Sequence, residues 1–299
     1  MEEAGAGVSR DEIGGFQLQT YALPEGAVSA RVWANPGKPL LLFLHANGFC
    51  ASAYRQVLEP LAADYEIVAP DLRGHGRTTL PADPAAHRSW DVYACDVLTL
   101  IRHWDRIPVA MAGHSMGATT ALLAAAQLES VPRLALIEPV LLPRPVYWVA
   151  RSPLHALNRN RMPIARQARR RRNGWPDRAA AVARYEKHPG FRRWADGVVA
   201  DYMTDGLKTG PDGGVSLACD PLWEAANYEA QGHNPEGAAR RAGTRVCMLK
   251  AEHGSTVMRP GLLTRHGARL DRLDGVGHLA PMEAPARVSA WLADTLQDG

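Results

Sequence analysis

The sequence lacks the features that mark disulfide-stabilised, exported and membrane-spanning proteins. Its four cysteines, Cys50, Cys95, Cys219 and Cys247, lie far apart without a C-x-x-C spacing, which argues against a disulfide framework and against a zinc site. No apolar run reaches the roughly 18 residues of a membrane span. The first residues are acidic and include no apolar signal segment, so we expect a cytoplasmic protein without a membrane or metal partner.

Charge is unevenly distributed along the 299 residues. The whole chain has a formal net charge of +3 and 46% hydrophobic residues, enough for a large core. Residues 141–241 contain 17 Lys and Arg against 10 Asp and Glu, which leaves 17 against 21 for the rest. The run Arg169–Arg172 could attract an anionic substrate or a nucleic acid. Because no aromatics are interleaved with it, it favours a solvated helix face, and no nucleic-acid partner is expected.

Short apolar runs alternate with helical patterns over most of the chain. Residues 15–23 and 28–34 alternate apolar and polar side chains, as the strands of a hairpin do. Further strands are predicted just before Gly113 and at 39–44, 65–69, 133–137, 244–251 and 268–273, and helices at 51–63, 90–104, 118–127 and 285–296. This order predicts an α/β fold with a mostly parallel central sheet flanked by helices. Residues 1–140 and 242–299 would form the core, and 141–241 a helical insertion.

Ser115 lies in the pattern Gly113-His114-Ser115-Met116-Gly117, between a predicted strand and a predicted helix. A G-x-S-x-G turn in this setting exposes the serine hydroxyl above the sheet, and glycines without a Cβ let the backbone pass closely. The backbone N–H of Met116, at the helix start, would face a developing negative charge. Ser115 is therefore predicted to be a nucleophile and Met116 an oxyanion donor; the alternative is a glycine-rich helix start with an ordinary serine.

A serine nucleophile needs a base, and the base needs an orienting acid. Of the eleven histidines, His278 lies between the last predicted strand and the last helix, so it should reach the sheet edge of Ser115. Glu138 ends the strand that follows the nucleophile helix, and sites assemble at the carboxyl ends of parallel strands. Glu138 is therefore favoured as the acid, and Glu252, close to the end of the next-to-last strand, is the alternative.

The loop after the first parallel strand, His45-Ala46-Asn47-Gly48-Phe49, is expected to supply the second oxyanion donor. The donor would be the backbone N–H of Asn47, and the alternative is a tight turn that requires Gly48. A structural role is favoured for His114, since it lies in a turn. Three residues are nevertheless kept as candidate substrate contacts: Phe49, His114 and Trp148.

These motifs together resemble those of the α/β-hydrolase superfamily, and nearly all of the chain takes part in the resemblance. It is carried by the G-x-S-x-G pattern, by His45-Ala46-Asn47-Gly48 in place of the usual His-Gly pair, by Asp71-Leu72-Arg73-Gly74-His75-Gly76 and by Gly277-His278. The resemblance implies an α/β-hydrolase fold in which the insertion 141–241 is the cap over the serine.

Within the superfamily, an acid at Glu138 is similar to the arrangement in zearalenone lactonases and in one branch of haloalkane dehalogenases. Asn47 likewise matches an asparagine of the dehalogenase oxyanion loop. Dehalogenases and epoxide hydrolases use an aspartate nucleophile, however, whereas this chain has Ser115. The resemblance therefore implies a cap-bearing serine hydrolase that needs no cofactor and cleaves small carboxylic esters or lactones through an acyl-enzyme.

Other functions stay open at this stage. The same site could hydrolyse thioesters or activated C–C bonds, or the chain could be a non-catalytic protein that binds a small ligand. The expected partner is the small-molecule substrate, and a homodimer is left open.

Overall fold

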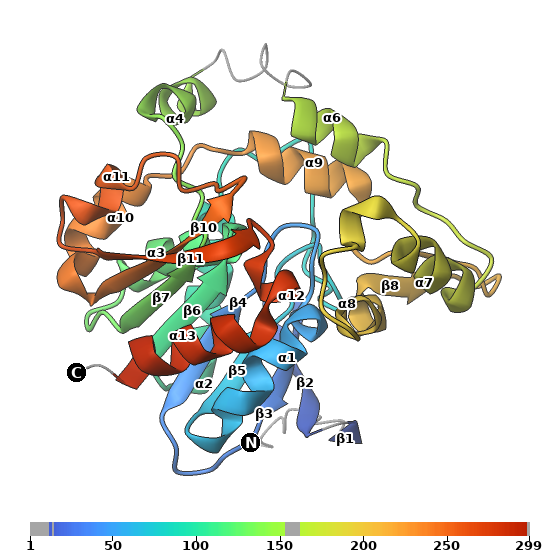
Figure 1. Cartoon of the computed structure of the whole chain (residues 1–299), viewed down its shortest axis with the longest axis horizontal. Helices are drawn as coiled ribbons and strands as arrows, with labels where there is room; N and C mark the ends of the chain where they lie inside the picture. The colour runs from blue at the N-terminus through green and yellow to red at the C-terminus, as the bar shows by residue number, and fades with distance from the viewer. Residues whose placement is uncertain (1–11, 14, 153–161, 298–299) are drawn as a thin grey trace.

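The computed structural model describes residues 12–13, 15–152 and 162–297. In this part of the chain nine strands form one sheet, in the order β1-β2-β3-β5-β4-β6-β7-β10-β11 (Figure 1). Pairing is antiparallel from β1 to β5 and parallel from β5 to β11. The strands are β1 Glu12–Ile13, β2 Phe16–Leu23, β3 Gly26–Trp33, β4 Leu40–Leu44, β5 Glu66–Pro70, β6 Ala110–His114, β7 Arg133–Ile137, β10 Val246–His253 and β11 Arg269–Gly277.

Helices cover both faces of this sheet. The strand β4 is buried along its whole length, with Leu40, Leu42 and Leu44 facing one layer and Leu41 and Phe43 facing the other. Such a strand has no polar face because both of its sides meet helices. The first layer contains α2 Asp91–Trp104, α3 Met116–Ala125, α10 Pro235–Ala242 and α11 Gly261–Thr264; the second contains α1 Arg55–Leu58, α12 Ala280–Glu283 and α13 Pro285–Gln297. The predicted α/β-hydrolase architecture is confirmed.

Residues 51–63 do not form the single helix that their spacing predicts. They form a 3₁₀ turn η1 at Ala51–Tyr54, the short helix α1 and a second 3₁₀ turn η2 at Glu59–Ala63. Pro60 lies at the start of η2. Proline has no N–H to donate and its ring crowds the preceding turn, so an α-helix cannot continue regularly through it.

The segment 141–241 is mostly helical, as predicted. Figure 1 shows α6, α7, α8 and α9 grouped beside one end of the sheet. The segment also contains a two-stranded sheet that was not predicted, β8 with β9, whose turn holds the glycine-rich stretch 210–214. Its elements are α4 Arg144–Arg151, α6 Pro163–Arg169, α7 Arg178–Glu186, the 3₁₀ turn η3 Pro189–Phe191, α8 Val198–Gly206, β8 Leu207–Thr209, β9 Val215–Leu217, α9 Pro221–Glu229 and α10; the 3₁₀ turn η4 Gly243–Arg245 follows it. Because α10 packs on α3 and α11, this helix lies with the core layer, and the division at 242 stays a prediction.

Ion pairs fasten α8 to the sheet. Asp205, at the end of α8, is 2% exposed. Its carboxylate accepts hydrogen bonds from Arg31 on β3 at 2.7 and 2.5 Å and from Arg77 at 2.7 Å. A buried carboxylate is tolerated only when it is paired in this way, so α8 keeps a defined position against the core.

Across the described residues, no helix combines the length and the apolar character that crossing a membrane would require.

Candidate active site

Ser115 occupies the sharp turn between β6 and α3. Its backbone has φ 55° and ψ −115°, a conformation that L-residues rarely adopt. A Cβ placed on Gly117 would lie 2.1 Å from the backbone oxygen of Leu44, and one placed on Gly113 would lie 2.6 Å from the backbone of Gly117. The two glycines are therefore required by close backbone approach, and the turn they allow holds Ser115 at the carboxyl end of β6.

His278 meets Ser115 from the loop that follows β11. The distance from His278 Nε2 to Ser115 Oγ is 3.1 Å. The backbone carbonyl of His278 accepts a hydrogen bond from His114 Nε2 at 2.8 Å, and Tyr54 donates its hydroxyl to His114 Nδ1 at 2.8 Å. Burial lowers the pKa of His114 well below its ordinary value, so this imidazole is neutral.

The proposed substrate contact at His114 is wrong in this structure. His114 is fully buried and both of its ring nitrogens are engaged within the protein. Its place beside the nucleophile is accounted for by the bond to His278, which fixes the loop that carries the imidazole. The structural alternative for His114 holds instead.

Glu138 contacts the other ring nitrogen of His278. The distance from Glu138 Oε2 to His278 Nδ1 is 3.0 Å. The carboxylate also accepts hydrogen bonds from the backbone N–H of Ala251 at 2.7 Å, from the Ser255 hydroxyl at 2.7 Å and from the Thr256 N–H at 2.9 Å. Burial alone would raise the pKa of Glu138, but the hydrogen bonds from His278, Ala251 and Ser255 outweigh burial and lower the pKa. Glu138 is therefore an ionised, fully buried carboxylate.

Glu252 lies elsewhere. Its Oε2 accepts the N–H of Gly275 at 2.6 Å and is 3.7 Å from His253 Nε2, and its side chain is 46% exposed. The structure thus brings Glu138, and not Glu252, to His278.

The predicted oxyanion donors are the backbone N–H groups of Met116 and Asn47. Met116 begins α3, so its N–H has no partner within the helix. Within residues 15–152 and 162–297, no hydrogen bond uses the N–H of Met116 or of Asn47. The loop of Asn47 is held by a bond from the Gly48 N–H to His75 Nε2 at 3.1 Å. Both N–H groups are therefore free to receive a ligand oxygen.

The Asn47 side chain is held by α9. Asn47 Nδ2 donates to the backbone oxygen of Glu224 at 2.9 Å, and Asn47 Oδ1 accepts from Asn227 Nδ2 at 2.8 Å. Asn227 is fully buried, and its own side-chain oxygen accepts the Tyr93 hydroxyl at 2.7 Å. The position of the candidate oxyanion loop thus depends on a helix from the insertion.

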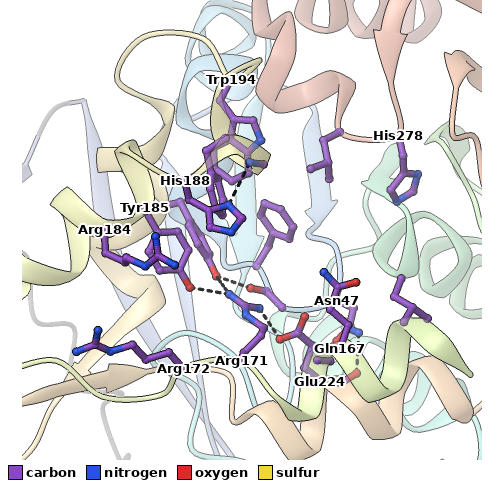
Figure 2. Close-up of a pocket in the computed structure, with 18 of the residues that line it drawn as sticks. Asn47, Gln167, Arg171, Arg172, Arg184, Tyr185, His188, Trp194, Glu224 and His278 are labelled. Carbon is purple, nitrogen blue, oxygen red and sulfur yellow. Dashed lines mark hydrogen bonds and ion pairs between the residues drawn. The ribbon is translucent and has the colours of Figure 1, made fainter.

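A cavity of about 490 Å³ lies between the core and the insertion (Figure 2). His278, Asn47 and Phe49 line it from the core, and Phe49 stacks on Trp194 with ring centroids 5.9 Å apart. Ser115 does not itself line this cavity; it is 8% exposed and reaches it through the imidazole of His278. Phe49 therefore lines the cavity together with His278, and its contact with a substrate stays a prediction.

Trp148, the third candidate substrate contact, lies away from this cavity. It is on α4, is 66% exposed and lines a separate cavity of about 200 Å³. The prediction for Trp148 is wrong. The sequence around an aromatic residue in the insertion does not show whether its helix directs it toward the cavity or toward solvent.

The arginine run is only in part the solvated helix face that its composition favoured, since Arg170 and Arg172 are exposed but Arg169 and Arg171 are paired. Arg169 pairs with Glu229 at 2.8 Å, and Arg171 pairs with Glu224 and donates to the Tyr185 hydroxyl at 2.8 Å. Arg171 and Glu224 both line the cavity, yet they are 53 positions apart in the chain. The only sequence signal for this cationic part of the cavity is the basic composition of residues 141–241, since no local motif links partners so far apart in the chain.

Among the described residues no group of three or more His, Cys, Asp or Glu side chains is placed to hold a metal ion.

The chain is similar to known hydrolases over most of its length. Residues 41–291 match a family model described as "Alpha/beta hydrolase family". A magnesium-chelatase 30 kDa subunit of Rhodobacter capsulatus is 33% identical over 90 residues, 28% of this chain and 29% of that protein. An epoxide hydrolase of Caballeronia sordidicola is 31% identical over 121 residues, 40% of this chain and 35% of that protein. The matches thus span about a third of these relatives.

Among solved structures, an E-2-(acetamidomethylene)succinate hydrolase superposes with a TM-score of 0.72 at 18% identity, covering 95% of this chain and 100% of that one. At this identity the superposition bears on the fold alone.

Proposed function

Because the chain belongs to the alpha/beta hydrolase family, we propose that it is a serine hydrolase that cleaves carboxylic esters or lactones through an acyl-enzyme. The observation that carries the proposal is the continuous chain of contacts from Ser115 Oγ through His278 to Glu138, at 3.1 and 3.0 Å. A nucleophile, a base and an orienting carboxylate are the groups that acyl transfer needs, and the distances are those of hydrogen bonds.

In the first half of the reaction, His278 Nε2 accepts the hydroxyl proton of Ser115 while the oxygen attacks the carbonyl carbon. Glu138 holds the Nδ1–H of the imidazole, which fixes the tautomer and stabilises the imidazolium that forms. Collapse of the tetrahedral intermediate breaks the bond to the leaving oxygen, which takes the proton back from Nε2. The acyl group then remains on Ser115.

In the second half, a water molecule replaces the alcohol. His278 accepts a proton from the water as its oxygen attacks the acyl carbon, and returns the proton to Ser115 when the acid leaves. The negative oxygen of both intermediates would be bound by the free N–H groups of Met116 and Asn47, each of which contributes roughly 3 kcal/mol in comparable sites.

The choice of esters and lactones over epoxides rests on the nucleophile. One relative is named an epoxide hydrolase, but an epoxide is opened by a carboxylate that forms an alkyl-enzyme ester, and this chain has a serine at that position. A serine alkoxide is suited to attack at a carbonyl carbon.

Turnover of p-nitrophenyl acetate and butyrate tests the proposal. We expect Ser115→Ala to lower kcat at least about a thousandfold, because the nucleophile and its base act as a unit. The parent should also react with a fluorophosphonate probe at Ser115. Saturable binding of these esters by the parent without turnover or labelling would instead indicate a ligand-binding protein that keeps the hydrolase architecture.

A further inference from the structure

The cavity that His278 lines has a cationic side. Figure 2 shows Arg172 and Arg184 on the side opposite His278, with Arg171 between them and Glu224. All three arginines line the cavity and come from the insertion. This part of the pocket takes no part in the proton transfers described above.

The charge on this side is not balanced. Glu224 is the one carboxylate among the described lining residues, and it pairs with Arg171. Within the described ranges neither Arg172 nor Arg184 forms an ion pair. Arg172 Nε donates to the carbonyl of Gly174 at 2.9 Å and its guanidinium lies 5.6 Å from the centre of the Trp175 ring, whereas the Arg184 guanidinium has no hydrogen bond, ion pair or ring contact with any described residue. The lining therefore carries two uncompensated positive charges.

Arg171 gives this side a fixed structure. Its guanidinium is held by Glu224 and by the hydroxyls of Tyr185 and Tyr202, at 2.8 and 3.4 Å. Burial alone would lower the pKa of Arg171, but Tyr202, Glu224 and Tyr185 raise the pKa, so the group stays charged. Burial raises the pKa of Glu224, although the pairing with Arg171 acts in the opposite direction. Glu224 can thus neutralise at most one of the three arginines.

Aromatic rings line the cavity between His278 and the arginines. Trp194 lies against Phe49 at 5.9 Å and against Phe191 at 4.6 Å, and Tyr185 lies 4.8 Å from Phe191. Flat apolar rings accept a hydrocarbon or aromatic segment of a ligand. The arrangement places an apolar surface between the imidazole of His278 and the guanidinium groups of Arg172 and Arg184.

We propose that the substrate of this enzyme carries an anionic group, a carboxylate or a phosphate, separated from the scissile carbonyl by an apolar segment and bound by Arg172 and Arg184. The inference rests on the proposed serine hydrolase activity for the position of the scissile bond, and on the geometry of the cavity for the anion. Guanidinium groups suit this role because their planar donors match the oxygens of carboxylate and phosphate.

Paired substrates test the anion. The first pair compares p-nitrophenyl hydrogen glutarate, adipate and suberate with the p-nitrophenyl esters in which the free carboxylate is converted to a methyl ester. The ratio of kcat/KM for the charged ester to kcat/KM for the neutral one reports the preference for a charged acyl group. A second pair, S-butyryl-4′-phosphopantetheine and S-butyrylpantetheine, places the anion in the leaving group. We expect the parent to prefer the charged member of at least one pair, and Arg172→Gln and Arg184→Gln each to lower that ratio about tenfold.

Arg170→Gln is the matched control. Arg170 is exposed, lies two positions before Arg172 in the sequence and does not line the cavity. The Arg170→Gln variant removes one positive charge, as Arg172→Gln and Arg184→Gln do. A preference for charged substrates that is caused by the overall positive charge of this surface would therefore decrease equally in all three variants. Equal falls, or a ratio near one for both pairs in the parent, would overturn the proposal.

A binding measurement separates this proposal from the catalytic one. Quenching of tryptophan fluorescence compares 3-phenylpropionate with 3-phenylpropanol, and phenyl phosphate with phenol, without any chemical step. Tighter binding of the anions that is weakened by Arg184→Gln supports the cationic site even if esters are not turned over. Equal affinities for the charged and neutral probes would refute it even if Ser115-dependent esterase activity is found.

Discussion

Replacing Glu138 by glutamine tests the geometry of the site most directly. The glutamate accepts four hydrogen bonds: Ala251 and Ser255 donate to Oε1, while His278 and Thr256 donate to Oε2. A glutamine must turn its NH₂ group toward one of these pairs of donors. In either orientation the bond from one backbone N–H, that of Ala251 or of Thr256, is lost, and the negative charge beside the imidazole disappears.

The expected loss follows from these contacts. Losing the charge and the correct tautomer of His278 is expected to lower kcat about 10³- to 10⁴-fold, which corresponds to about 4 to 5.5 kcal/mol of transition-state stabilisation. The unpaired buried donors should also lower the free energy of unfolding by about 1 to 3 kcal/mol. The activity loss is thus expected to exceed the stability loss, which separates an effect on chemistry from an effect on folding.

The assay combines p-nitrophenyl butyrate turnover, the rate of fluorophosphonate labelling and thermal unfolding, for the parent, Glu138→Gln and Glu252→Gln. Glu252 is half-exposed and bonded to Gly275, so its variant should keep activity within about threefold of the parent. The reasoning is refuted if Glu138→Gln stays fully active while Glu252→Gln does not.

Three further predictions concern the surroundings of the site. Gly117→Ala should destabilise the fold by more than about 2 kcal/mol, seen as a lower Tm, because its Cβ would lie 2.1 Å from a backbone oxygen of β4; an unchanged Tm would contradict the close approach. Asn227→Ala should lower kcat about tenfold with little change in KM, since it releases Asn47, and the affinity for a neutral probe should stay unchanged. Burial lowers the pKa of five histidines of the described chain, that of His75 to about 4, so these side chains are neutral in the folded protein. In the unfolded chain the same histidines bind protons below the ordinary histidine pKa of 6.5. The free energy of unfolding should therefore be highest above about pH 6.5 and decrease toward pH 4, by up to about 1.4 kcal/mol per pH unit for each histidine. A Tm that does not change over this pH range would exclude the effect.

The sheet and the approach of Ser115, Glu138 and His278 could be anticipated because each depends on a local pattern joined to a topological rule. Apolar runs of about five residues mark strands buried on both faces, and successive parallel strands bring their carboxyl ends to one edge. Glu138 directly follows β7, so its position could be read from the order of elements before any distance was known.

The cavity could not be anticipated in the same way. The pairing of Arg171 with Glu224 joins α9 to a loop 53 positions away, and the exposure of Trp148 depends on how α4 lies against the rest of the molecule. Both are set by tertiary packing, which a periodic pattern does not encode. For His114 the structural role that its place in a turn favoured agrees with the structure, whereas its retention as a candidate substrate contact does not, because hydrogen bonds to Tyr54 and His278 use both of its ring nitrogens.

Because the carboxylate that contacts His278 is Glu138, directly after β7, the loop that follows β10 does not need to supply a carboxylate. Ser255 donates its hydroxyl to the Glu138 carboxylate, while Thr256 donates its backbone N–H to the same carboxylate and its hydroxyl to the backbone oxygen of Glu138. None of these donors is a carboxylate, so the contact between Glu138 and His278 requires no acidic side chain in this loop. A sequence motif that requires an aspartate in this loop would overlook hydrolases built on this plan.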